Sequence, residues 1–231
     1  MRQGLVVDLG QKDYRECWDL QHRIHRARQR DLLPDCLFLV EHPHVLTLGR
    51  KGNRENVLIN ESGLKKRGIP VLAIERGGDV TYHGPGQIVG YPIFNLEKNG
   101  GGVIEFIERL EEVMILSLKD FGISGERNPR NRGVWVGDEK LGFVGVAVIR
   151  GITLHGFALN VAPDLFCFEM INPCGLKGVR VTSMGELLGI SPQMREIKER
   201  IIIHMERVFG LSLEVRDQNT LLAGIPEPDT Q

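Results

Sequence analysis

The sequence predicts an α/β fold on three observations. Apolar runs of strand length recur along the 231 residues, and longer segments with apolar positions at three- and four-residue steps lie between them. Hydrophobic residues make up 42% of the chain, which is enough for a substantial core. The sequence contains no internal repeat and no low-complexity linker. We therefore expect one domain over residues 1–231.

The N-terminal part of the chain predicts short strands around two helices. The strands are expected at residues 4–9, 36–40, 45–48 and 69–74, and the helices at 12–30 and 62–67. In the first helix, Tyr14, Trp18 and Ile24 recur at helical spacing and are expected to face inward. A run of arginines on the same helix is expected to face outward, as a solvated surface rather than a docking site for an acidic partner: Arg23, Arg26, Arg28 and Arg30.

The rest of the chain continues this pattern. Strands are expected at residues 88–94, 132–136, 140–149, 152–161 and 211–215, and amphipathic helices at 103–121 and 191–209. Ser191 is expected to cap the last helix, with Pro192 in its first turn. Alternation along 152–161 predicts Thr153, His155 and Phe157 on one face of the sheet. Residues 225–228 are expected to form a frayed tail.

Composition argues against several classes of partner. Twenty-nine basic and thirty acidic side chains give a net charge of −1, so a nucleic-acid partner held by phosphate neutralisation is not expected. Charged residues interrupt the first eight residues before the apolar segment of a signal peptide can form. No later apolar run reaches the length of a membrane-spanning helix. We expect a cytoplasmic, soluble protein without a membrane partner.

Residues 76–87 are the most unusual stretch of the sequence. They read Arg-Gly-Gly-Asp-Val-Thr-Tyr-His-Gly-Pro-Gly-Gln and contain four glycines and a histidine. Glycine allows a backbone to lie close against a ligand, and Pro85 stiffens the segment, so we expect a loop that forms one wall of a pocket. The Walker and dinucleotide glycine spacings are both absent, and a strand rather than a helix is predicted to follow.

One of the four cysteines is a candidate nucleophile. Cys17, Cys36 and Cys167 have apolar neighbours typical of a core. Cys174 lies in Asn-Pro-Cys-Gly, where a turn presents the thiol, although turn cysteines are often incidental. A reactive thiol needs a base or cation nearby. Lys140 heads an apolar strand where burial could lower its pKa, but the pattern alone favours a strand end in solvent.

The histidines leave further alternatives open. His83 and His155 each precede a glycine, and could act as bases or simply lie beside a close backbone approach. His42 and His44 flank a proline without a nearby carboxylate cluster, which favours a polar turn over a metal site. No Cys-x-x-Cys pair or zinc-finger spacing occurs, so no metal is expected.

Taken together, these motifs resemble the lipoyl(octanoyl) transferase family. The similarity spans about residues 41–188, in matching order and spacing. It comprises Glu-His-Pro at 41–43, Thr-Leu-Gly-Arg at 47–50, the stretch at 76–87, Tyr-Pro-Ile at 91–93, Gly-Val-Trp-Val at 133–136 with Lys140, His-Gly-Phe-Ala-Leu-Asn-Val at 155–161, Asn-Pro-Cys-Gly at 172–175 and Val-Thr-Ser at 181–183. The resemblance implies the α/β catalytic domain of biotin and lipoate protein ligases, with a mixed sheet flanked by helices.

The resemblance also implies an activity and its residues. An octanoyl or lipoyl group would pass from acyl carrier protein, as a thioester on Cys174, to a lysine of the lipoyl domains of 2-oxoacid dehydrogenases or of the glycine cleavage H protein. Lys140 matches the residue that lowers the pKa of the cysteine and acts as base. No ATP, metal or other cofactor is implied. The matching substrate-binding residues are Arg76, Gly77, Gly78, Asp79, Val80, Thr81, Tyr82, His83, Phe143, Val144, Gly145, His155, Gly156, Phe157 and Ala158.

One residue departs from the pattern, and two other functions compete with this one. Phe143 follows Lys140 where the family commonly has small residues, so a ring is expected near the acyl channel. An ATP-dependent lipoate or biotin ligase shares the Arg-Gly-Gly loop and the lysine, but Cys174 argues against it. A binding module or metal protein using His83, His155 and Cys174 is the third possibility.

Overall fold

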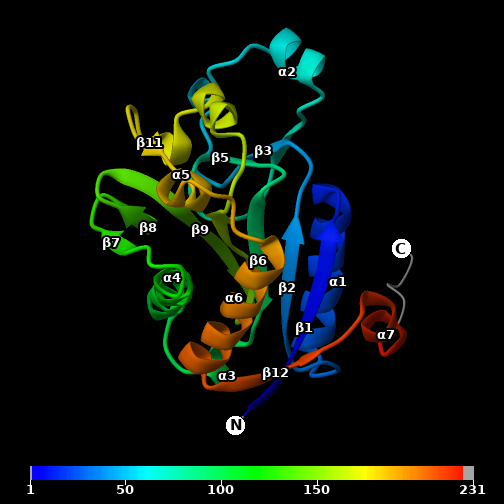
Figure 1. The fold of residues 1–231 in the computed structure, drawn as a ribbon. Helices are drawn as coiled ribbons and strands as arrows, with labels where there is room; N and C mark the ends of the chain where they lie inside the picture. Colours follow the sequence, from blue (N-terminus) through cyan, green and yellow to red (C-terminus); the bar gives the residue numbers. More distant parts are fainter. Residues whose placement is uncertain (1, 226–231) are drawn as a thin grey trace.

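A mixed sheet forms the frame of the molecule in a computed structural model, which describes residues 2–225 (Figure 1). Its strands follow the order β12-β1-β2-β6-β10-β9-β8-β7, and β11 pairs with β9. β1 is parallel to β2 and β12, whereas the pairs from β2 to β7 are antiparallel. The strands are β1 (Arg2–Gln11), β2 (Asp35–Glu41), β6 (Gln87–Ile93), β7 (Glu126–Asn128), β8 (Asn131–Val136), β9 (Glu139–Ile149), β10 (Ile152–Asn160), β11 (Arg180–Val181) and β12 (Leu211–Val215). The predicted mixed sheet is confirmed.

A second, small sheet contains part of the stretch that was predicted as a loop. Its order is β4 (Val71–Ala73), β3 (Val45–Leu48) and β5 (Val80–His83). The prediction of a loop over all of residues 76–87 is therefore wrong. Val-Thr-Tyr-His in the middle of the stretch consists of residues that fit a pleated, half-buried surface, and their pairing with β3 outweighs the flanking glycines.

Helices cover both faces of the large sheet. α1 packs on one face, and α4 and α6 pack on the other (Figure 1). The helices are α1 (Tyr14–Gln29), α2 (Glu61–Arg67), α3 (Leu96–Asn99), α4 (Val103–Lys119), α5 (Met184–Leu188), α6 (Met194–Phe209) and α7 (Gln218–Ala223). Three 3-10 turns are η1 (Arg54–Asn56), η2 (Leu165–Met170) and η3 (Pro173–Gly175). Across the described residues, no helix is both long and apolar enough to cross a membrane.

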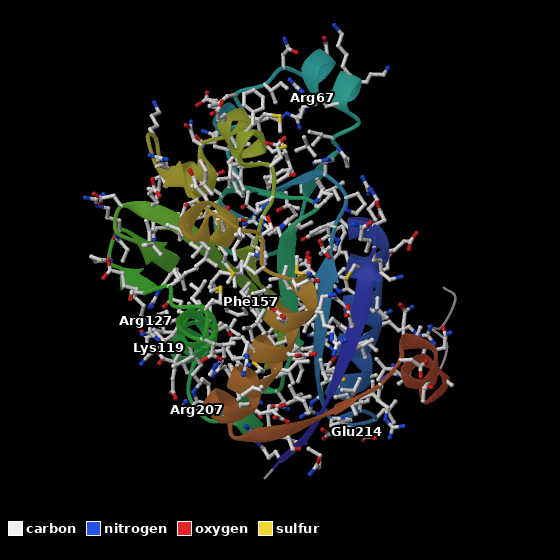
Figure 2. The ribbon with its side chains drawn as sticks, in the orientation of Figure 1. Arg67, Lys119, Arg127, Phe157, Arg207 and Glu214 are labelled. Carbon is white, nitrogen blue, oxygen red and sulfur yellow. The ribbon has the colours of Figure 1, made fainter. Side chains whose placement is uncertain are left out.

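Two hydrophobic cores lie on the two sides of the sheet. One contains Ile24 of α1 and Tyr91 of β6, and the other contains Leu110 of α4 and Phe157 of β10. Figure 2 shows Phe157 in the interior near α4 and α6. His155 instead lies near Tyr91 of the first core, so its side chain does not share the face of Phe157 as predicted, although both residues line one pocket. The reason is a φ of 58° at His155, which breaks the alternation of the strand.

Several local predictions also need correction. Arg28 is buried, with its Nε donating to Asp35 Oδ1 at 2.7 Å, so the arginine run does not face outward as a whole. α6 begins at Met194 without a side-chain cap, so Ser191 does not cap it. α3, α7 and β7 were not predicted. Ile225 is buried in the core rather than frayed, and residues 226–228 lie outside the described residues.

The core on the α4 and α6 side predicts a position-dependent loss of stability. Ile201→Ala removes a fully buried side chain of α6, and should lower the free energy of unfolding by about 2–5 kcal/mol. Ile203→Ala on the same helix is the control, because its side chain is 47% exposed. This change should stay within about 0.5 kcal/mol. Urea denaturation compares the two, and equal losses would contradict this packing.

Candidate active site

A pocket lies on the α1 side of the large sheet, with about 460 Å³ of atom-free space that includes open solvent at its mouth. Strands β6, β9 and β10 form its floor, and β5 with the glycine-rich segment before it forms another wall. The lining residues are Tyr14, Arg76, Gly77, Gly78, Thr81, His83, Val89, Tyr91, Phe143, Val144, Gly145, His155, Gly156, Phe157, Ala158 and Cys174. Most of the residues predicted to contact substrate therefore share one cavity.

Three of the predicted substrate-binding residues do not line this pocket. Because β5 alternates, Thr81 and His83 face the pocket, whereas Val80 and Tyr82 belong to the hydrophobic core behind it. Asp79 has a different place. Its carboxylate accepts hydrogen bonds from the backbone N–H of Asn53 at 2.9 Å and from the side chain of Asn56 at 2.5 Å. These contacts support the loop rather than the cavity.

The prediction missed three pocket residues: Tyr14, Val89 and Tyr91. Signals for them were present in the sequence. Tyr14 was expected to face inward from its helix, and Tyr91 opens the Tyr-Pro-Ile motif. Val89 lies two residues before Tyr91 and so shares its face of β6. The local sequence pattern does not show that α1 packs over β6 and β10, which brings Tyr14 to the pocket.

A close approach between two segments shapes the wall around Arg76. The backbone N–H of Gly77 donates to Val146 O of β9 at 2.9 Å. A Cβ at Gly145 would lie 3.1 Å from Arg76 Cδ and 3.2 Å from Gly77 O, so glycine lets the segment lie against the strand. The buried guanidinium of Arg76 donates to Thr47 O at 2.7 Å and to Gly77 O at 2.9 Å. No ion pair within residues 2–225 includes Arg76, so its charge remains available to the pocket.

Lys140 and Cys174, which are 34 residues apart in the sequence, meet at this site. Lys140 Nζ lies 3.6 Å from Cys174 Sγ. The same nitrogen donates to Arg132 O at 2.7 Å and to Asn131 Oδ1. An ammonium has three N–H donors, and all three have a partner here. The side chain of Lys140 is 0% exposed, so the alternative of a solvent-exposed strand end is wrong.

The loop that carries Cys174 has an unusual backbone conformation. Cys174 lies in η3 with a φ of 58°, a value that few residues other than glycine adopt. The loop is held in place from outside, since Asn172 N–H donates to Asn56 O at 2.8 Å and Asn56 in turn donates to Asp79. Such strain persists where the surroundings over-determine it. The glycine-rich segment thus supports the cysteine loop through Asp79.

Burial separates Lys140 from ordinary lysines and Cys174 from the other cysteines. Burial lowers the pKa of Lys140, and the neighbouring Cys174 and Glu111 act in the opposite direction. Burial raises the pKa of the Cys17 and Cys36 thiols to about 12, and raises that of Cys167. Those three thiols are inert at neutral pH. Cys174 is only half-buried and faces a cation.

His83 is a buried, neutral side chain of β5, and a chain of hydrogen bonds connects it to the backbone of Lys140 in β9. Burial lowers the pKa of His83 to about 3, with further lowering by the charges of His42 and Arg76. Its Nδ1 donates to Gln87 Oε1 at 2.7 Å, which leaves Nε2 as an acceptor. A chain of hydrogen bonds continues from Gln87 to Asn160, from Asn160 to Thr182 O, and from Thr182 N–H to Lys140 O.

His155 occupies the part of the pocket nearest α1. Its positive φ turns its backbone N–H toward Gln21 Oε1 of α1, which accepts at 2.9 Å. Its Nε2 lies 3.4 Å from Glu75 Oε1. Burial lowers the pKa of His155, although Glu75 opposes the shift. Over the part of the chain that the structure describes, no three His, Cys, Asp or Glu side chains group as metal ligands, so His83, His155 and Cys174 do not form such a set.

Comparison with known proteins identifies the class of this fold. The family model for the lipoyl protein ligase A/B catalytic domain matches residues 13–206, a longer span than the predicted 41–188. Solved structures agree on the fold: lipoate-protein ligase A bound with ATP superposes with a TM-score of 0.79 at 16% identity, over 93% of this chain and 89% of that one. Biotin protein ligase from Aquifex aeolicus superposes with a TM-score of 0.52 at 12% identity, over 91% and 70%. The predicted fold family is confirmed.

More similar sequences narrow the class. An octanoyltransferase of Syntrophobacter fumaroxidans is 47% identical over 209 residues, which cover 90% of this chain and 92% of that protein. An octanoyltransferase of Desulforamulus reducens is 40% identical over 217 residues, which cover 94% and 95%. The chain belongs to the octanoyltransferase family and is an acyltransferase, as its motifs predicted.

The contact between Lys140 and Cys174 predicts selective reactivity. Iodoacetamide at neutral pH should alkylate Cys174 alone, because burial raises the pKa of the other three thiols and Cys174 is the half-buried one. Lys140→Met should slow this alkylation at least about 10-fold, because the reacting sulfur loses a charged hydrogen-bond donor, a contact worth roughly 1.5–3 kcal/mol. Lys177→Met, an exposed lysine three residues after the thiol, is the control and should leave the rate unchanged. Peptide mapping with label on Cys167, or equal rates in both variants, would contradict the assignment.

Proposed function

We propose that this acyltransferase moves an octanoyl or lipoyl group from acyl carrier protein to a lysine of a lipoyl domain, through a thioester on Cys174. The observation that carries the proposal is the 3.6 Å contact between Lys140 Nζ and Cys174 Sγ at the wall of the pocket. Membership of the octanoyltransferase family supports the acyl group, and the motif match supports the two roles. The remaining pocket residues then surround the acyl chain.

In the first step, the Cys174 thiolate attacks the carbonyl carbon of the acyl thioester on the pantetheine arm of the carrier. A bond forms between that carbon and Sγ, the bond to the pantetheine sulfur breaks, and the released pantetheine thiolate takes up a proton from Lys140, which becomes a neutral amine. The Lys140 ammonium stabilises the thiolate before attack. Exchange of one thioester for another is close to isoenergetic, so the step needs no ATP.

In the second step, the amine of the acceptor lysine attacks the thioester on Cys174. An amide bond forms, the bond to Sγ breaks, and the amine loses one proton. Lys140 receives that proton, and burial supports this role because it lowers the pKa of Lys140 toward the working range of a base. Once Lys140 is again an ammonium, the Cys174 thiolate that leaves has its counter-charge beside it.

The pocket provides an apolar place for the chain. Val89, Phe143, Val144 and Ala158 line it together with glycines. Burial of an acyl chain contributes about 0.8 kcal/mol per methylene, so eight carbons supply several kcal/mol of binding. Phe143 stacks on Phe168 with ring centroids 5.4 Å apart, which fixes one wall. This ring limits the space on its side of the cavity.

The proposal also defines the partners and the absence of cofactors. The donor is octanoyl acyl carrier protein, and the acceptors are the lipoyl domains of 2-oxoacid dehydrogenases and the glycine cleavage H protein. The reaction uses neither ATP nor a metal, because the acyl group arrives already activated as a thioester. The fold shared with ATP-dependent ligases at 16% identity does not decide this point, since one fold can carry different chemistries.

The thioester intermediate gives the first test of the proposal. Mixing the protein with octanoyl acyl carrier protein should add one octanoyl group, which intact mass and peptide mapping should place on Cys174. Cys174→Ala should abolish both the adduct and transfer, whereas the control Cys167→Ala should keep them. Incubation with ATP, free octanoate and labelled pyrophosphate should give no exchange. An adduct on another cysteine or robust exchange would overturn the proposal.

The Phe143 wall gives the second test. Phe143→Ala removes a ring that lines the pocket, and should raise kcat/KM for a decanoyl donor relative to an octanoyl donor by about 10-fold or more, the range for one or two methylenes in an apolar pocket. Phe166→Ala is the control, since Phe166 is exposed and does not line this pocket. An unchanged ratio in Phe143→Ala would show that the chain end lies elsewhere.

A further inference from the structure

A buried carboxylate on α4 lies behind Lys140, outside the pocket. Glu111 is only 1% exposed, and it lies on the buried, mostly apolar face of the helix. A buried carboxylate is costly unless it is paired and hydrogen-bonded. One oxygen of Glu111, Oε1, accepts the backbone N–H of Gly133 at 2.7 Å. Its other oxygen lies 3.3 Å from Arg127 Nε and 3.5 Å from Arg132 Nη1. Figure 2 shows Arg127 beside α4.

The segment that Glu111 holds is the one that receives the Lys140 ammonium. Arg132 O and Asn131 Oδ1 accept two of the three N–H bonds of Lys140, and Gly133 follows directly. Gly133 has a φ of 124°, and a Cβ there would lie 2.2 Å from Gly142 O and 3.1 Å from Lys140 Cε. At Gly133, β8 therefore lies close against Lys140 in a backbone conformation that favours glycine. The hydrogen bond to Glu111 holds β8 at this residue.

We propose that Glu111 is a positioning residue for Lys140: it fixes the end of β8 that carries the acceptors of the ammonium, and its negative charge balances that ammonium. Its effect on Cys174 passes through Lys140, so its role in transfer rests on the proposed function. The bond to Gly133 supplies the geometric part of this role, and the carboxylate charge supplies the electrostatic part. Burial lowers the pKa of Lys140, and the charge of Glu111 opposes this fall, which agrees with the electrostatic part of the role.

The other charged side chains around Lys140 and Glu111 form ion pairs with one another. Arg127 also pairs with Glu112, and Arg132 also pairs with Glu108. The groups that face Lys140 and Glu111 from the packed elements are Cys174, Arg127, Arg132, Glu108 and Glu112. Glu112 is the natural comparison, because it follows Glu111 on the same helix and is 39% exposed in its side chain. Its loss changes the local charge equally without touching Gly133.

The ionisation of Lys140 can be measured directly in the full chain, without any transfer reaction. In protein with ¹³Cε-labelled lysine, an NMR titration follows the Lys140 signal, which Lys140→Arg identifies by its loss. Glu111→Gln keeps an oxygen for the Gly133 N–H but removes the charge, so the Lys140 midpoint should fall by about one pH unit. Glu112→Gln should leave the midpoint at its original value. An unchanged midpoint in Glu111→Gln would overturn the proposal, whatever the outcome of the transfer assays.

A second variant separates position from charge and covers a failure of Glu111→Gln to fold. Glu111→Asp keeps the charge on a side chain one methylene shorter, which no longer reaches the Gly133 N–H. Hydrogen exchange at the Gly133 amide should accelerate at least about 10-fold in this variant, as expected when a hydrogen bond worth roughly 1.5 kcal/mol is lost. Native protection of Gly133 in Glu111→Asp would overturn the positioning role.

Discussion

A buried ammonium that needs partners for all its protons organises this site. Lys140 has no exposed surface, and an isolated charge in that position would cost several kcal/mol. Two oxygens of β8 and the sulfur of Cys174 meet the requirement together. The start of β8 and the cysteine loop, which are distant in sequence, are thereby connected through one nitrogen atom. The two oxygens hold the ammonium in place, and the third contact puts it beside the sulfur of Cys174.

The glycine-rich segment at residues 76–79 both lines the pocket and supports the loop of Cys174. One side of it lines the pocket, where close packing against β9 leaves Arg76 as a buried cation without a carboxylate partner among the described residues. The other side supports the loop of Cys174 through Asp79 and Asn56. A positive φ at Cys174 is tolerated because these contacts hold the loop from outside. The shape of the pocket and the presentation of the thiol therefore depend on one segment.

The scaffold leaves the reaction to the side chains. Lipoate-protein ligase A has this fold at 16% sequence identity, so the sheet and its helices are compatible with more than one way of activating an acyl group. In this chain the pocket combines an apolar floor with Cys174, whose sulfur contacts Lys140. A helix on the far side of the sheet, α4, contributes the carboxylate of Glu111 behind that pair. Residues from both faces of the sheet thus surround Lys140.

The sequence by itself determined the features that local pattern encodes. Helical and strand periodicity gave the α/β class, the glycine-rich stretch marked a pocket wall, and the Asn-Pro-Cys-Gly turn singled out Cys174 from three core cysteines. Only the tertiary structure decided that Lys140 is buried against Cys174, that Tyr14 reaches the pocket from α1, and that Glu111 lies behind the lysine. Spacing along a chain shows which face of an element is buried. Which distant segment covers that face depends on long-range packing, and the pKa of each group follows from it.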